Sequence, residues 1–148
     1  MKLTTLAYVS EAARGLGLAD LKHILRRSRE HNFRADVTGY LVYDGIWFAQ
    51  LLEGSAAALE ATMARIEADE RHHDIQMLLR GEITQRCFEG FFMGCANLAA
   101  PVHLDTSELR GVIRDFVGQR ELTLHEVQAF FRLFSEFRTP EQAALLSL

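Results

Sequence analysis

The sequence predicts an α+β domain whose helices pack on a mixed, mainly antiparallel five-stranded sheet. Three observations predict it: several short apolar stretches favour strands, two helical stretches interrupt them, and only helical periodicity follows Pro101. A length of 148 residues suits one such domain with a buried core. We therefore expect a sheet domain over residues 1–98 and a helical extension over residues 99–148.

The first strand and helix are predicted over residues 3–10 and 18–32. Alternation along the strand puts Leu6 and Tyr8 on the same side. Gly15 breaks the chain before the helix. The helix carries an apolar stripe at helical spacing, formed by Leu18, Leu21, Ile24 and Leu25.

A hairpin and a second helix follow. Strands over 37–43 and 46–53 are joined at Asp44-Gly45, a dipeptide typical of tight hairpin turns. Ser55 has the residue type and position of a helix N-cap. The helix after it presents one inner face, formed by Leu59, Thr62, Met63 and Ile66.

Two more strands, over 74–83 and 88–96, complete the order β-α-β-β-α-β-β, which is close to a ferredoxin-like plan. Two helices come after them, one beginning near Asp105 and one at Thr123, where Glu126 completes a capping box. The last helix carries Phe130, Phe131, Phe134 and Phe137. We expect the pair to cover the free face of the sheet; an oligomer or partner surface on part of it stays open.

Composition excludes several classes of protein. The formal net charge is −4, and no cluster of lysine and arginine stands clear of acidic neighbours, which argues against a nucleic-acid partner. No apolar run approaches the roughly 20 residues of a membrane span, and the N-terminus does not resemble a signal peptide. Cys87 and Cys95 are too few for a disulfide framework and lack the spacing of a metal site. We expect a soluble cytoplasmic protein without a metal.

Polar residues on apolar faces suggest a binding pocket. Alternation puts Gln50 on the same side as Phe48 and Leu52, and an unpaired buried amide costs on the order of 1–3 kcal/mol. A backbone group of a neighbouring strand and a ligand are both candidate partners for it. The stripe of the first helix likewise turns polar at Ser28 and Asn32, although Asn32 also suits a helix C-cap.

Tyr8 lies on the same side of its strand as Leu6, and a strand tyrosine with its hydroxyl at the rim is common. Taken together, Tyr8, Asn32 and Gln50 favour one shared polar pocket near the helices. Such a pocket suits a planar heteroaromatic ligand with donors and acceptors on its edge. Periodicity does not identify that ligand.

Five motifs, in order over roughly residues 3–97, resemble those of the BLUF family of flavin-binding light sensors. They are Leu6-Ala7-Tyr8-Val9-Ser10; Ser28-Arg29-Glu30-His31-Asn32; Thr38-Gly39 with Phe48-Ala49-Gln50-Leu51-Leu52-Glu53-Gly54; Asp69-Glu70-Arg71-His72; and Arg86-Cys87-Phe88-Glu89-Gly90-Phe91-Phe92-Met93. Each motif alone is weakly specific, but five in register are specific. One departure is Phe91, where the family often has tryptophan.

The resemblance implies non-covalent FAD, or FMN, between the two N-terminal helices. It implies that Gln50 bonds the flavin near N5 and O4 as well as the Tyr8 hydroxyl, and that Asn32 holds the far carbonyl edge. The other cofactor contacts that we expect are Ser28, His31, Leu41, Phe48, Arg65, Ile66, Asp69, Arg71 and His72. For Arg71 and His72, a solvated surface role stays open. A metal pair of His72 and His73 is disfavoured because adjacent strand residues point to opposite faces.

The implied function is a blue-light sensor, not an enzyme. Tyr8 would give an electron and then a proton to the excited flavin, and the Gln50 amide would rearrange its hydrogen bonds, which gives a red-shifted state. We expect Met93, on a last strand beside the Gln50 strand, to relay the change; an ordinary core methionine is the alternative. Because Phe91 stands where the family often has tryptophan, and Trp47 lies on the opposite face from Gln50, we expect no competing tryptophan donor.

We expect the signal to reach a homo-oligomer interface or a downstream protein partner, since no motif of a separate output domain appears. There are two alternatives to this function. An acylphosphatase-like hydrolase shares the β-α-β-β-α-β plan, but Arg14 falls in a loop without the anion-binding pattern. A degenerate module that has lost its flavin is disfavoured because Tyr8, Asn32, Gln50 and Met93 are all present.

Overall fold

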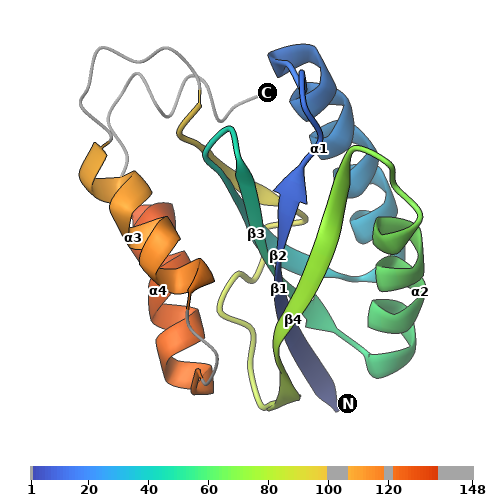
Figure 1. Ribbon diagram of the computed structural model, residues 1–148. Helices are drawn as coiled ribbons and strands as arrows, with labels where there is room; N and C mark the ends of the chain where they lie inside the picture. Colours follow the sequence, from blue (N-terminus) through green and yellow to red (C-terminus); the bar gives the residue numbers. More distant parts are fainter. Residues whose placement is uncertain (1, 100–106, 119–121, 137–148) are drawn as a thin grey trace.

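The chain forms a five-stranded sheet between two pairs of helices (Figure 1). The computed structural model describes residues 2–99, 107–118 and 122–136, without the side chains of 107–110 and 112. The elements are β1 (Leu3–Ala12), α1 (Leu18–Ala35), β2 (Thr38–Tyr43), β3 (Trp47–Gly54), α2 (Ala56–Glu67), β4 (His72–Ile83), β5 (Gly94–Asn97), α3 (Ser107–Val117) and α4 (Leu124–Glu136). The predicted α+β class and element order are confirmed.

Sheet register brings the polar residues of the apolar face together. The strand order is β4-β1-β3-β2-β5, with β5 parallel to β2 and the other neighbours antiparallel. Gln50 in the central strand lies directly opposite Tyr8 on one side and Leu41 on the other. Directly opposed residues of an antiparallel pair share a face, so these three side chains form one row across the sheet.

The last strand differs from the prediction in length and neighbour. Residues 88–93 form turns and bends, and the strand begins only at Gly94. Gly90 has a φ of +84°, and the Phe91 N–H turns back to the Phe88 carbonyl at 3.0 Å. The expectation that this strand lies beside the Gln50 strand is wrong, because β1 and β2 already occupy both edges of β3.

Local signals at the turns and helix ends acted largely as expected. The Asp44 carboxylate accepts hydrogen bonds from the amides of Ile46 (2.9 Å) and Trp47 (2.7 Å), and it closes the hairpin. The Ser55 hydroxyl accepts one from Ala58 N at 3.2 Å, as an N-cap does. The capping box of Thr123 and Glu126 is present in both directions.

Each sheet face carries its own apolar core. The core under α1 and α2 includes Leu6, Leu21, Phe48 and Leu52, among others, and the opposite core receives the inner sides of α3 and α4. Phe130, Phe131 and Phe134 are all buried in that second core, which confirms that the helix pair covers the sheet. Phe137, Pro101 and Asp105 lie outside the described residues. No helix in the described ranges is long and apolar enough to cross a membrane.

Candidate functional site

A pocket partly open to solvent lies between the sheet and the helices α1 and α2, with about 680 Å³ of empty space when the adjoining open solvent is included. Its lining consists of Tyr8, Ile24, Arg27, Ser28, Asn32, Leu41, Phe48, Gln50, Thr62, Arg65, Ile66, Asp69, Arg71 and His72. Every expected cofactor contact except His31 is in this lining.

A short chain of hydrogen bonds crosses the sheet side of the pocket. The Tyr8 hydroxyl donates to Gln50 Oε1, and Gln50 Nε2 donates to Met93 Sδ at 3.3 Å. All three side chains are buried, with Gln50 only 5% exposed. Burial, and to a smaller extent the charge of Asp69, raises the pKa of the Tyr8 phenol well above its usual range. Tyr8 therefore remains a neutral hydrogen-bond donor at physiological pH.

Two buried amides keep unused hydrogen-bonding capacity at this pocket. Asn32 Nδ2 donates to the Phe92 carbonyl at 2.6 Å, yet its Oδ1 receives no bond from the described part of the chain. The second N–H of Gln50 likewise finds no acceptor there. Buried polar groups are nearly always paired, so these atoms fit a ligand with acceptors and donors on its rim. A flavin ring has such a rim, and the residues present fit it.

Apolar side chains and His72 form further parts of the pocket wall. Phe48 and Leu41 come from the sheet, and Ile66 comes from α2. His72 Nε2 lies 2.6 Å from the Ile66 carbonyl, and Nδ1 lies 2.7 Å from Ser10 Oγ. Because a carbonyl only accepts, His72 Nε2 carries a proton and donates it to the Ile66 carbonyl. His72 is half-buried, and these two contacts hold its ring in place.

Positive charge gathers at the rim of the pocket. Arg71 forms a two-pronged ion pair with Asp69, with Nε to Oδ1 at 2.9 Å and Nη2 to Oδ2 at 2.6 Å. These hydrogen bonds hold the pKa of the Asp69 carboxyl below its usual range. Arg27 and Arg65 form no ion pair with any described residue. Cations without an internal partner suit the phosphate end of a flavin nucleotide.

A family comparison identifies the type of domain. The family model named BLUF, described as sensors of blue light using FAD, matches residues 3–94, more than half of the chain. The chain belongs to the BLUF family. BLUF domains are flavin-binding sensory modules rather than enzymes, and the resemblance seen in the motifs is thereby confirmed.

The BLUF relatives that match this chain differ greatly in length. The photoactivated adenylate cyclase subunit beta of Euglena longa is 35% identical over 86 residues, which cover 58% of this chain and 10% of that subunit. The blue light- and temperature-regulated antirepressor BluF of Escherichia coli (strain K12) is 29% identical over 133 residues, 89% of this chain and 32% of that protein. The chain thus spans only a tenth of the cyclase subunit and a third of the antirepressor.

Two solved structures share the BLUF fold seen here. The dark-state structure of BlrB, a BLUF protein, matches with a TM-score of 0.72 and 28% identity, covering 92% of this chain and 98% of that one. A structure of Klebsiella pneumoniae BlrP1 with FMN and cyclic diGMP has a TM-score of 0.65 and 31% identity, covering 91% of this chain and 34% of that one.

His31 and three other residues depart from the expected site. His31 Nε2 lies 3.2 Å from Thr62 Oγ1, whose proton goes to the Ala58 carbonyl at 2.7 Å, so His31 donates and bridges α1 to α2 behind the pocket. Ile24 and Thr62 also line the pocket, although the sequence predicts for them only a place on the inner faces of their helices. Each lies four residues before an expected contact, Ser28 and Ile66, and helical spacing was the signal that predicts them. Arg27 also lies four residues before an expected contact, His31, but that contact is itself outside the lining.

The alternative for Asn32 as a helix C-cap is wrong. The helix α1 continues to Ala35, and Asp36, with a φ of +54°, is the C-cap residue. Asn32 lies one turn earlier with its side chain buried. Trp47 packs against the core under α3 and α4, on the other face from Phe48 and Gln50, as predicted.

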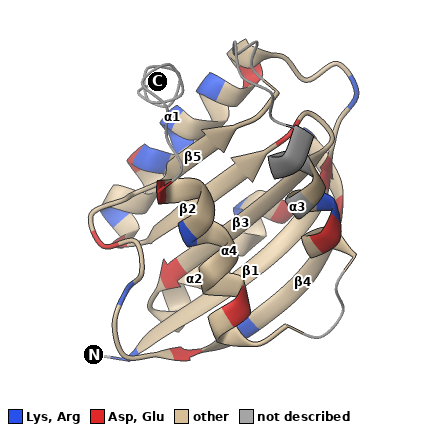
Figure 2. Cartoon of the chain, turned by 90° about the vertical axis from the view of Figure 1, so that its left-hand side faces the viewer, with Lys and Arg blue, Asp and Glu red and all other residues tan. Residues whose placement is uncertain are grey.

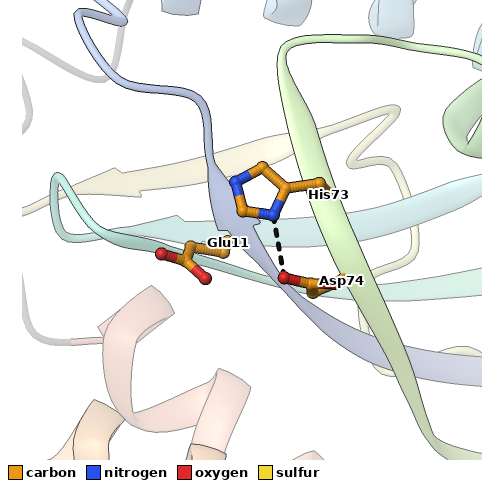
Figure 3. A group of neighbouring side chains, drawn as sticks. All are labelled: Glu11, His73 and Asp74. Atoms are coloured by element: carbon orange, nitrogen blue, oxygen red, sulfur yellow. Dashed lines mark hydrogen bonds and ion pairs between the residues drawn. The ribbon is translucent and has the colours of Figure 1, made fainter.

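A separate polar group lies on β1 and β4, outside the pocket lining (Figure 3). One ligand atom each of Glu11, His73 and Asp74 lies within 4.8 Å of the others, and His73 Nδ1 is 2.9 Å from Asp74 Oδ2. His72 bonds Ser10 whereas His73 pairs with Glu11 in the register, so the two histidines do not share a site. Exposed carboxylates in this arrangement do not by themselves assign a metal.

Proposed function

We propose that this BLUF chain senses blue light with FAD held in the pocket under α1 and α2, and that Tyr8, Gln50 and Met93 carry its response. The observation that supports the proposal most is the buried hydrogen-bonded row of these three side chains beside two incompletely paired amides. The expected contacts are the lining residues given above, with Arg27 and Arg65 near the phosphates. FMN, which the BlrP1 structure contains, would use the same ring contacts.

The first part of the response belongs to Tyr8. A bound flavin excited by blue light supplies a strong one-electron oxidant. The Tyr8 phenol gives up an electron, and its proton leaves toward Gln50 Oε1, the atom that already accepts its hydrogen bond. Both return to Tyr8 before the cycle ends, so nothing is consumed and no enzymatic turnover is proposed. What differs afterwards is the hydrogen-bond arrangement of Gln50.

The second part belongs to the Gln50 amide and Met93. A half-turn of the amide exchanges its donor and acceptor ends, and it directs Oε1 toward Met93 Sδ, which Nε2 bonds at 3.3 Å in this structure. A thioether sulfur is only an acceptor, so two acceptors then face each other and the contact is lost. Met93 must shift or rotate, and this shift carries the signal out of the pocket.

Absorption spectra of Gln50→Leu test the proposal. The purified chain loaded with FAD is expected to be yellow and to show a reversible red shift of its flavin band under blue light. Gln50→Leu keeps the side-chain volume but has no amide, so it should bind FAD and lose the shift. Gln76→Leu, the same change at an exposed position of β4, should behave like the unchanged protein. A full shift in Gln50→Leu would refute the role of the amide.

A further inference from the structure

The outer side of α1 carries a basic strip. The helix contains five lysine and arginine residues against Asp20 and Glu30, whereas the whole chain has a net charge of −4 (Figure 2). Lys22, Arg26, Arg29 and Glu30 line one shallow, open depression, as their helical spacing requires. No carboxylate among the described residues pairs with Lys22 or Arg26. Lys22 and Arg26 therefore present positive charge with no ion-pair partner among the described residues, and Glu30 is the one acid beside them in the depression.

An aromatic pair lies next to this strip. Phe33, four residues after Arg29 on the same helix face, is 67% exposed. Its ring meets Phe92 edge to face, with ring centroids 5.1 Å apart. Exposed aromatic rings beside arginine are typical anchors of protein interfaces. The basic strip and the aromatic pair together offer a partner both positive charge and an apolar contact.

The strip is tied to the pocket through residues 92 and 93. Arg29 Nε donates to the Met93 carbonyl at 2.9 Å, and Asn32 donates to the Phe92 carbonyl at 2.6 Å. Met93 Sδ accepts the Gln50 amide. Both pocket amides thus hold the two-residue segment that positions Arg29 and the Phe92 ring. A displacement of Met93 changes the strip directly, without passing through the sheet.

We propose that this strip of α1, with Phe33 and Phe92, binds an acidic protein segment that carries an aromatic or leucine anchor, with an affinity that differs between dark and light. The light dependence rests on the proposed function, because Gln50 supplies it. The charge of the strip favours an acidic segment. The overall negative charge of the chain opposes a nucleic acid, whose long polyanion would meet far more of the surface than the strip.

Peptide selection tests the occupant. A displayed library of random short peptides is selected against the full-length, FAD-loaded protein under blue light, and enriched peptides are measured by fluorescence anisotropy. We expect enrichment of acidic peptides with an aromatic or leucine residue, and weaker binding at high ionic strength. Lys22→Glu with Arg26→Glu, and Phe33→Ser, should each reduce affinity tenfold or more. The matched controls, Arg80→Glu with Arg114→Glu, and Leu133→Ser, should not.

Light dependence is measured with the same peptides. Affinity should change by about fivefold or more between dark and continuous blue light, a coupling of ordinary size. The strip variants keep the red shift of the flavin band, so lost binding with an intact shift separates this inference from the proposed function. Any of four results would overturn the inference. They are enrichment of neutral or basic peptides, unchanged binding by the strip variants, equal affinity in dark and light, and tighter binding of a single-stranded oligonucleotide.

Discussion

Individual residues matter here through the number of hydrogen bonds that each can make. Gln50 has a donor end and an acceptor end, and its neighbours differ in kind: Tyr8 can donate or accept, whereas Met93 can only accept. The orientation seen, with Nε2 toward Met93, satisfies both neighbours. The reverse orientation satisfies only Tyr8. This asymmetry gives the amide two arrangements of unequal energy.

Met93→Leu tests that asymmetry with little change in volume. Leucine keeps the packing but cannot accept a hydrogen bond, so the dark arrangement loses roughly 0.5–1 kcal/mol and the lit state should return to dark up to about fivefold more slowly. The red shift itself should remain. Met63→Leu, a buried methionine of the same core, is the matched control and should leave recovery unchanged. Time-resolved absorbance measures both; unchanged recovery in Met93→Leu would mean that Met93 only fills space.

The elements show how far the sequence predicts this structure. Alternation placed Tyr8, Phe48 and Gln50 on one face because central strands have a strict period of two, and the structure confirms it. The same reasoning failed for residues 88–93. Their apolar side chains give a pattern typical of a strand, but Gly90 turns the chain. The backbone amides of Cys87 and Phe88 donate hydrogen bonds to the Glu53 carboxylate, at 2.6 and 3.0 Å. Contacts between residues so far apart in the sequence cannot be read from the local sequence pattern.

Glu53→Ala tests the anchor of that segment. Glu53 is fully buried, and it also accepts a hydrogen bond from Thr38 Oγ1 at 3.2 Å. Its removal leaves the buried amide of Phe88 without a partner and weakens the hold on Cys87, so the free energy of unfolding should fall by about 2 kcal/mol or more. Glu82→Ala, an exposed glutamate on β4, should change it by no more than about 0.5 kcal/mol. Urea unfolding measures both free energies. Equal losses in Glu53→Ala and Glu82→Ala would show that the Glu53 carboxylate does not anchor the segment.

In the whole molecule, the two faces of the sheet are covered differently. One face carries the pocket, and the other is closed by α3 and α4, whose phenylalanines turn inward. That inward packing removes Phe130, Phe131 and Phe134 from any oligomer surface, one of the alternatives that the sequence left open. The family resemblance predicts Arg65, Arg71 and His72 at the pocket. Arg27 in the lining and the contacts of His72 with Ser10 and Ile66 needed the folded chain, since they join residues distant in sequence.

A homo-oligomer remains our prediction for the assembled protein. The strand β4 is an edge of the sheet, paired only with β1, and it exposes Met77. Unpaired edges and exposed apolar side chains favour association between copies. Light scattering of the FAD-loaded protein should give a mass above that of one 16.8 kDa chain. A single-chain mass in both dark and light would contradict the prediction.

The account depends most on Tyr8 as the donor beside Gln50, and light-minus-dark absorbance of FAD-loaded Tyr8→Phe tests it most directly. The variant loses one hydroxyl and should stay yellow without any red shift. Tyr43→Phe removes a hydroxyl from a tyrosine that stacks on Phe48 but does not line the pocket, and it should shift as the unchanged protein does. A normal red shift in Tyr8→Phe, or a chain that takes up no FAD at all, would contradict the account.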